Sequence, residues 1–531
     1  MATRPLGAQI SHMLKDRGVD TIFGIPGVHN QEMYRGIEEA GITHVLARHE
    51  QGAGFMADGY ARATRRVGVA YVISGPGLCN IMTPMGQAYS DSVPMLVLTS
   101  VLNETAATRG QLHQMKDQVG AAGTVCDWSA TAQSADAAYQ LIDRALTEMQ
   151  TGVPLPKAIH VPIAQLEAQA EAAPARADEW PYRMESAPLQ RIALMDRLNA
   201  SKRPLFIFGG GATHGVDQWY PHFQRLNAAS FTTYAGRGII PDDAPLHFGA
   251  MLARPGSAEV IASADLVVAV GTRLSEVDLW REHLGHSGPL VRIDIDPESL
   301  SDRHNADTRI LADASSHLVE CLIQLDGVKE TTWRSKDVAE TRSRWRAELE
   351  AERPGIPAVS DALKAALPAE TMIFSDMTQF AYAAKEIYPM DRPNHWHHPF
   401  GFGTLGYALP AAIGGKVGVG DQPVVAILGD YGFQYTVQEL GVAVELGLNL
   451  PIIIWDNGKL GEIEDSMVRA QIAPNAVVQR NPDFLKLAEA YGAAADEPAT
   501  LADLGRSLLA AFARDVPTVI RLRSDIALTS S

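Results

Sequence analysis

Short, continuously apolar runs alternate with longer segments of mixed polarity along most of the chain. The clearest runs are residues 43–46, 69–73, 204–208, 265–273, 290–297, 424–428, 451–455 and 518–522. Strands of parallel sheets are buried on both faces and read as such runs. Because the segments between them look helical, the pattern predicts α/β domains built on parallel sheets.

Two breaks in this pattern divide the chain. Residues 167–188 are rich in Ala, Glu, Pro and Arg and contain no apolar strand, and residues 329–353 are highly charged. A chain of 531 residues also exceeds what one hydrophobic core usually supports. The sequence therefore predicts three parallel-sheet domains, at residues 1–166, 188–328 and 357–531, with a linker after the first.

An acid and an amide follow two neighbouring strands of the third predicted domain. Asp430 comes just after the run at 424–428, and Asn457 follows the run at 451–455. In a parallel sheet both side chains lie at the carboxyl ends of strands, where open α/β sheets bind ligands. Oxygen donors in this position suit Mg²⁺, which shares its coordination shell with phosphates. The pair predicts a metal-bound diphosphate; the alternative is two ordinary turns, in which Asp and Asn are common.

Composition and charge narrow the classes of partner. The formal net charge is −17 and no basic patch stands out, so nucleic acid is not an expected partner. No apolar run approaches the roughly 20 residues of a membrane span, and the amino terminus lacks the apolar core of a secretory signal. Cys79, Cys126 and Cys321 have neither metal-ligand spacing nor an even count for disulfides. We expect a cytoplasmic protein with no membrane partner.

The segments around Asp430 and Asn457 resemble a known cofactor motif. They read Gly-Asp-Tyr-Gly at 429–432 and Asp-Asn-Gly at 456–458, and are similar to the thiamine-diphosphate motif of the acetolactate synthase and pyruvate decarboxylase family. The resemblance implies thiamine diphosphate and Mg²⁺ as cofactors, with the metal held by Asp430, Asn457 and the carbonyl of Lys459. The residues it places against the cofactor are Gly429, Asp430, Tyr431, Gly432, Asn457, Leu460 and Gly461.

Two positions depart from that motif. Tyr431 replaces the second glycine, and Asp456 replaces the first of two asparagines. Both expected ligand side chains are kept. The tyrosine leaves open what shape the backbone takes near the diphosphate.

A second segment resembles the helix that carries the family's catalytic acid. Residues 48–62 match it closely, and Glu50 holds the position of a buried glutamate that hydrogen-bonds the cofactor's aminopyrimidine ring. A carboxyl group shielded from water has a raised pKa, which suits proton sharing with a weakly basic ring nitrogen. A lone glutamate is otherwise usually a solvated surface residue. The resemblance therefore implies Glu50 as the catalytic acid.

Further segments resemble parts of the family that contact the cofactor. The stretch at 401–412 resembles the one that holds the cofactor bent, with Leu405 between its rings and the carbonyl of Gly403 at its exocyclic amino group. The remaining expected contacts are Pro26, Gly27 and Asn80 around the pyrimidine, and Thr378 and Gln379 at the diphosphate.

The three domains then correspond to a pyrimidine-binding, a central nucleotide-fold-like and a diphosphate-binding domain. The triple glycine at 209–211 misses the dinucleotide-binding spacing by one residue. No clear match to flavin-contacting segments is present, so FAD is not expected. In the family Glu50 and Asp430 would come from different subunits, which implies a homodimer as the minimal active unit and a homotetramer as the expected assembly.

The reaction implied is the decarboxylation of a 2-oxo acid, and the chain most resembles those members of the family that act on 5-guanidino-2-oxopentanoate. A guanidinium needs planar carboxylate partners, and Glu462 is the preferred one. Glu464 and Asp465 are further acids that could instead form a solvated helix face. The alternatives are carboligation of two 2-oxo acids, as in acetolactate synthases, and a catalytically inactive cofactor-binding homologue.

Two histidines and a glutamine complete the candidate catalytic set. His113 and His29 are the expected proton donors, because they fall in loops that the family brings near the cofactor. They are preferred to the cluster at His395, His397 and His398. Gln114 aligns with a glutamine of the acetolactate synthases.

Overall fold

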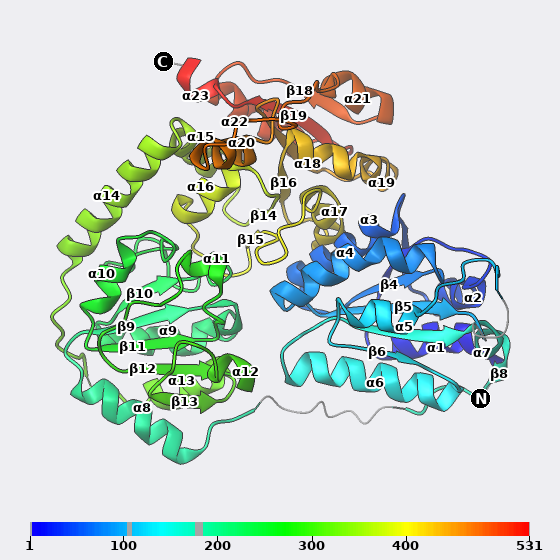
Figure 1. The fold of residues 1–531 in the computed structure, drawn as a ribbon, viewed down its shortest axis with the longest axis horizontal. Coiled ribbons are helices and arrows are strands. Elements are labelled where there is room, and N and C mark those ends of the chain that lie inside the picture. Colours follow the sequence, from blue (N-terminus) through cyan, green and yellow to red (C-terminus); the bar gives the residue numbers. More distant parts are fainter. Residues whose placement is uncertain (1–2, 104–108, 176–183, 326, 530–531) are drawn as a thin grey trace.

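The computed structural model describes residues 3–103, 109–175, 184–325 and 327–529, which form three α/β domains (Figure 1). Each domain is built on one parallel sheet, as the alternating pattern predicts. None of the helices in these four ranges is long and apolar enough to cross a membrane.

The amino-terminal domain has a six-stranded parallel sheet of order β3-β2-β4-β5-β7-β6. Its strands are β2 (Thr21–Gly24), β3 (Thr43–Leu46), β4 (Gly68–Val72), β5 (Met95–Val101), β6 (Trp128–Thr131) and β7 (Lys157–Pro162). The accompanying helices are α1 (Leu6–Asp16), α2 (Gln31–Glu39), α3 (Glu50–Thr64), α4 (Pro76–Asp91), α5 (Gln118–Gly123) and α6 (Ala135–Thr151). Every residue of β2, β4 and β7 is buried, which explains why apolar residues dominate these strands, although β7 also carries the buried polar residues Lys157 and His160.

The central domain has a five-stranded parallel sheet of order β10-β9-β11-β12-β13. Its strands are β9 (Pro204–Phe208), β10 (Ala229–Thr232), β11 (Leu266–Val270), β12 (Leu290–Asp294) and β13 (Thr308–Leu311). The triple glycine follows β9 and packs against the end of β11. A Cβ on Gly209 would lie 2.3 Å from the carbonyl oxygen of Gly271, so close backbone packing accounts for this glycine.

The carboxyl-terminal domain has a six-stranded parallel sheet of order β15-β14-β16-β17-β19-β18. Its strands are β14 (Met372–Ser375), β15 (Trp396–His397), β16 (Val424–Gly429), β17 (Pro451–Asp456), β18 (Ala494–Asp496) and β19 (Thr518–Arg523). The flanking helices include α15 (Ile356–Ala366), α16 (Gln379–Ile387), α17 (Ala408–Val419), α18 (Asp430–Tyr435), α19 (Leu440–Glu445), α20 (Gly461–Arg469), α21 (Phe484–Tyr491) and α22 (Leu501–Phe512).

Both connecting segments contain regular secondary structure. Residues 169–170 of the segment at 167–188 form the short strand β8 (Gln169–Ala170), which is not an apolar run and which pairs antiparallel with β1 (Arg4–Pro5). Within that segment, residues 176–183 lie outside the described part of the chain. The charged stretch after the central domain forms one long helix, α14 (Ser335–Glu352), which runs beside the central domain towards the carboxyl-terminal one (Figure 1).

Helices α3 and α17 bind the first and third domains of the chain to each other through glycines. A Cβ on Gly59 would lie 1.9 Å from the carbonyl oxygen of Ala411, and a Cβ on Gly414 would lie 1.9 Å from that of Met56. Any larger side chain at either glycine would separate the helix backbones. The small residues in α3 and α17 therefore serve this close interdomain packing.

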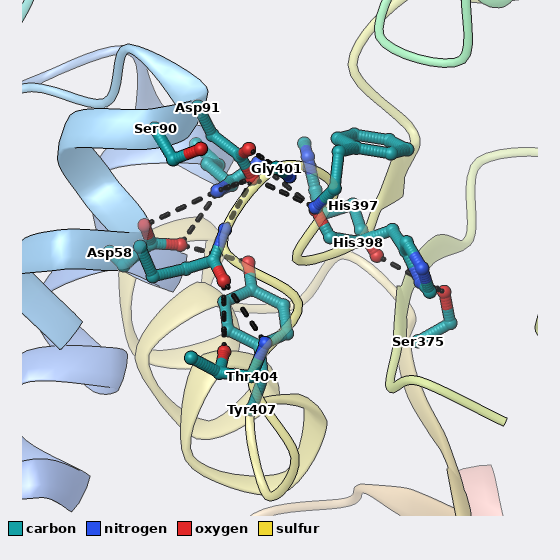
Figure 2. A network of polar contacts seen from close by, with 12 residues as sticks. Asp58, Ser90, Asp91, Ser375, His397, His398, Gly401, Thr404 and Tyr407 are labelled. Carbon is teal, nitrogen blue, oxygen red and sulfur yellow. Dashed lines mark hydrogen bonds and ion pairs between the residues drawn. The ribbon is translucent and has the colours of Figure 1, made fainter. Parts of the chain in front are cut away.

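A buried polar network continues this interface (Figure 2). Arg62 of α3 donates hydrogen bonds to Asp58 at 2.6 Å and to Asp91 of α4 at 2.9 Å. Asp91 in turn accepts from the backbone amide of Gly401 at 2.9 Å, and Asp58 accepts from the hydroxyl of Tyr407 at 2.8 Å. Through this network, side chains of the amino-terminal domain fix the loop at 398–407. That loop carries the predicted cofactor contacts Gly403 and Leu405.

Removing the charge of Arg62 tests how much this network contributes to the stability of the fold. The side chains of Arg62, Asp58 and Asp91 are 9%, 0% and 3% exposed. Arg62→Met would leave two buried carboxylates without their cation, and we expect a loss of about 3 kcal/mol in the free energy of unfolding. Chemical denaturation monitored by tryptophan fluorescence measures it. Arg144→Met, which breaks an exposed pair with Glu148, is the control. An equal effect of both substitutions would contradict the prediction.

Candidate active site

Glu50 and Asn80 meet at the carboxyl edge of the amino-terminal sheet. Glu50 is the first residue of α3 and is half-buried in this chain, and its Oε2 accepts a hydrogen bond from Nδ2 of Asn80 in α4 at 2.9 Å. Gly77 lies beside them, since a Cβ on it would be 3.4 Å from Oε1 of Glu50. The structure therefore brings together the predicted acid and one of the predicted pyrimidine contacts.

The two predicted proton donors also lie together. The rings of His29 and His113 are 4.9 Å apart in an edge-to-face arrangement, and Nδ1 of His29 lies 2.8 Å from Oγ of Ser74. Burial, followed by the neighbouring His113, lowers the pKa of His29. The backbone of His113 is left-handed, with φ of 61°, a conformation that a histidine adopts at some energetic cost.

Three other predicted residues of the amino-terminal domain, Gln114, Pro26 and Gly27, make their contacts within their own loops or with the end of β4. Oε1 of Gln114 accepts the backbone amides of Gly110 at 2.8 Å and Gln111 at 3.3 Å, so this oxygen stabilises its own loop. Pro26 is exposed, and Gly27 lies directly against Ile73, where a Cβ would be 2.2 Å from the isoleucine Cδ1. The loop carrying Pro26 and Gly27 is thus packed against the end of β4.

The carboxyl-terminal sheet brings Asp430 and Asn457 to one edge. Gly429, the last residue of β16, pairs with Trp455 of β17, so the chain leaves both strands at the same level. Oδ2 of Asp430 accepts hydrogen bonds from the amide of Gly458 at 2.9 Å and from Nδ2 of Asn481 at 2.6 Å. Burial raises the pKa of Asp430, and nearby Asp456 adds to this increase.

Asn457 connects this edge to the predicted diphosphate turn. Its Nδ2 donates to Oε1 of Gln379 at 2.9 Å, and its Oδ1 accepts the amide of Lys459 at 3.2 Å. Gln379 begins α16 and lies against Gly461, where a Cβ would come within 2.7 Å of its amide group. Thr378, the residue before α16, lies near Gly429. The predicted diphosphate contacts from three strand ends therefore lie together, with Leu460 next to them as the N-cap of α20.

The structure explains both departures from the cofactor motif. Tyr431 lies within α18, where the backbone is helical and needs no glycine, and its ring contacts that of Tyr435 at 5.6 Å. Gly432 is the position that requires glycine, because a Cβ there would lie 2.7 Å from Oδ2 of Asp376. Asp456 accepts from Nε of Arg521 at 2.7 Å, so its charge is paired within the domain.

Asp376 holds the loop with the two remaining predicted contacts. Its side chain is buried, and it accepts the amide of Gly406 at 2.8 Å and that of Met377 at 2.8 Å. Burial raises its pKa to about 7. Gly403 has a left-handed backbone with φ of 67°, which glycine adopts without strain, and half-buried Leu405 lies between it and Gly406.

The acids after Asn457 hold a guanidinium that belongs to the chain itself. Arg353, just after α14, donates to Oε2 of Glu462 and, at 3.2 Å, to Oδ2 of Asp465. Asp465 also accepts from Nε2 of Gln379 at 3.3 Å. Because Gln379 also accepts from Asn457, it links Asp465 to Asn457. Glu464 pairs with Lys459. The predicted solvated face of α20 thus carries a set of ion pairs.

Several residues at this site give no signal in the sequence. Asn481 donates to both Asp430 and Asp456, and Arg353 lies more than a hundred positions before its partners. Asp376 lies two positions before the predicted contact Thr378 but is not itself part of the predicted set. No local pattern distinguishes these residues, because their partners are close in space and remote along the chain. The less favoured histidines His397 and His398 are buried.

The donor set at Asp430 fits a hard divalent cation bound to a diphosphate. A buried carboxylate, an amide oxygen and a loop carbonyl are the oxygen ligands that Mg²⁺ prefers. Burial raises the pKa of Asp430, and a bound cation would favour its charged form. The loop of Lys459 is placed by a backbone bridge to Val478 and by the left-handed Gly458, with φ of 67°. Asp430, Asn457 and the Lys459 carbonyl are the groups that could hold the ion.

Sequence models of the thiamine pyrophosphate enzymes match each of the three domains. The N-terminal thiamine pyrophosphate-binding domain matches residues 4–121, the central domain residues 192–322 and the C-terminal thiamine pyrophosphate-binding domain residues 376–522. The chain therefore belongs to the thiamine pyrophosphate enzymes, within the class of 2-oxo acid decarboxylases and related carboligases.

Relatives that are similar over nearly the whole chain include both a probable decarboxylase and acetolactate synthases. A probable 2-ketoarginine decarboxylase from Pseudomonas aeruginosa is 42% identical, over 98% of this chain and 94% of its own. The acetolactate synthase isozyme 3 large subunit of Escherichia coli is 32% identical, over 90% and 87%. The acetolactate synthase large subunit of Haemophilus influenzae is 30% identical, over 94% and 90%.

Proposed function

We propose that this chain decarboxylates 5-guanidino-2-oxopentanoate without oxidation, using thiamine diphosphate and Mg²⁺. The observation that carries the substrate assignment is that Glu462 and Asp465 bind the guanidinium of Arg353. Glu462 also pairs with Arg469, so a substrate guanidinium would have to take the place of one of these arginines. The similarity to the probable 2-ketoarginine decarboxylase supports the same substrate class.

The residues of the chain would divide the work in the following way. When bound, thiamine diphosphate would supply the carbanion chemistry that decarboxylation of a 2-oxo acid requires. Asp430, Asn457 and the Lys459 carbonyl hold Mg²⁺ and so orient the diphosphate. Glu50, fixed by Asn80, holds a proton at the aminopyrimidine ring.

Two further groups would act on the substrate. His29 and His113 stand close enough to act as one proton-delivering pair, and burial together with the neighbouring His113 lowers the pKa of His29. Glu462 would bind the guanidinium of the substrate tail through charge-assisted hydrogen bonds.

Glu50 and Asp430 lie in different domains, and we propose that a homodimer, assembled further into a homotetramer, completes each site.

Product analysis tests this proposal. The purified protein with thiamine diphosphate and Mg²⁺ is expected to convert 5-guanidino-2-oxopentanoate into CO₂ and 4-guanidinobutanal, identified by mass spectrometry. With pyruvate alone, acetolactate formation is the competing outcome, and the acetolactate synthase relatives are the reason to test for it. Acetolactate from pyruvate, with no 4-guanidinobutanal formed from 5-guanidino-2-oxopentanoate, would reject the proposal in favour of carboligation.

Glu462→Gln tests the substrate assignment. Losing one charged partner of the guanidinium is expected to raise KM for 5-guanidino-2-oxopentanoate about tenfold, the equivalent of one hydrogen bond to a charged group. Because the change is remote from the reacting carbonyl, kcat/KM for 2-oxopentanoate should stay near its original value. Glu464→Gln, on the same helix but paired with Lys459, is the matched control. Equal losses for both substrates would contradict recognition of the tail by Glu462.

A further inference from the structure

A buried carboxyl group, that of Glu439, lies against the start of the helix that begins with Glu50. Glu439 ends the short 3₁₀ helix η3 (Val437–Glu439) of the carboxyl-terminal domain, and it is 0% exposed. Its Oε2 accepts the backbone amide of Arg48 at 3.1 Å, and the neighbouring amide of His49 also acts to lower the pKa of the carboxyl group. These are the two amides immediately before Glu50, so Glu439 holds the backbone where the catalytic acid is placed.

The other oxygen of Glu439 is buried without any hydrogen-bond partner in the described part of the chain. It faces α3, since a Cβ on Gly52 would lie 2.3 Å from Oε1. The missing side chain at position 52 therefore makes room for the carboxyl group. An unpaired buried polar atom is destabilising, so stability alone gives no reason for an acid at position 439.

We propose that Glu439 is a positioning residue for Glu50, fixing the first turn of α3 from the carboxyl-terminal domain so that the Glu50 carboxyl group stays beside Asn80. The inference rests on the proposed role of Glu50. Glu439 acts through the backbone of residues 48–49 and contacts neither substrate nor cofactor in this role. Burial raises the pKa of Glu439 to about 7, so a neutral side chain of the same shape, glutamine, should preserve the function.

Three variants and a control separate positioning from general stability. Glu439→Ala removes the acceptor, Gly52→Ala displaces it from the opposite side, and Glu439→Gln keeps an acceptor oxygen. The control is Glu445→Gln on α19, because Glu445 pairs with the side chain of Arg48 and not with the backbone. The readout is the rate at which bound thiamine diphosphate exchanges its thiazolium C2 proton for deuterium, which requires cofactor activation but no turnover.

The expected pattern is specific. Glu439→Ala and Gly52→Ala should slow the C2 exchange about 100-fold, the cost of a small misplacement of a catalytic group. Glu439→Gln should stay within about fivefold of the original rate, the equivalent of one neutral hydrogen bond. Glu445→Gln should leave the rate unchanged. The proposal would be overturned if folded Glu439→Ala exchanged the C2 proton as fast as the unchanged protein. It would also be overturned if Glu439→Ala and Glu439→Gln slowed the exchange equally.

Amide hydrogen exchange of the cofactor-free protein gives a second readout that does not depend on the proposed function. Peptides covering residues 46–56 should exchange faster in Glu439→Ala and Gly52→Ala but not in Glu439→Gln. If the original protein neither binds thiamine diphosphate nor exchanges the C2 proton, the proposed function fails, while unchanged amide exchange in Glu439→Ala refutes the positioning itself. A lower unfolding temperature with unchanged exchange at both sites would assign Glu439 a purely structural role.

Discussion

Replacing Glu50 by glutamine is expected to slow decarboxylation by about 10²–10⁴-fold, the range that a positioned acid–base group contributes. Glutamine has the same shape and can still accept the hydrogen bond that Asn80 donates to Oε2, so the fold should be preserved. What it lacks is an ionisable group that can share a proton with the ring nitrogen. The measurement is steady-state turnover of 5-guanidino-2-oxopentanoate together with the deuterium exchange rate of the cofactor's C2 proton.

Two comparisons make the Glu50→Gln result specific. The affinity for thiamine diphosphate should change far less than the rate, because Glu50 acts on one ring nitrogen and leaves the diphosphate contacts intact. Glu38→Gln, an exposed change on α2, should behave like the original protein. Full turnover in Glu50→Gln would sink the proposed activation of the cofactor.

Replacing Asp430 by asparagine is expected to weaken Mg²⁺-dependent binding of thiamine diphosphate by at least about 100-fold, because even partners outside the coordination shell contribute 10–100-fold to metal affinity. Asp430 is buried at the end of β16 with two donors on Oδ2. Asparagine keeps an oxygen but loses the charge. Titration with cofactor at fixed Mg²⁺, followed by tryptophan fluorescence, gives the affinity.

The adjacent acid provides the matched control for Asp430→Asn. Asp456→Asn removes a carboxylate that Arg521 neutralises, so it should change cofactor affinity much less.

Mixing the two variant chains then tests the assembly. If each site takes Glu50 from one chain and Asp430 from another, a dimer of one Glu50→Gln and one Asp430→Asn chain keeps one intact site, and an equal mixture should regain roughly a quarter of the activity. No recovery from a mixture shown to exchange subunits would place both residues of a site in one chain.

Strand-end residues were predictable from the sequence because short-range patterns determine them. The apolar runs at 424–428 and 451–455 correspond to β16 and β17, and their parallel pairing brings Asp430 and Asn457 to one edge. Glu50 likewise follows β3 directly and begins α3. In each case the strand, the turn and the polar residue are consecutive in the chain, so local sequence carries the information.

Tertiary structure alone decided how these residues are held. The hydrogen bond from Arg48 to Glu439 spans 391 positions, and Arg353 reaches Glu462 across 109. The replacement of a motif glycine by Tyr431 became understandable only from the helical backbone there and from Asp376 packed against Gly432. The sequence by itself therefore determined the three parallel sheets, the cofactor class and the polar residues at strand ends, since these depend on consecutive positions. The partners of those residues depend on which domains pack together, and that depends on complementary surfaces distributed over the whole chain.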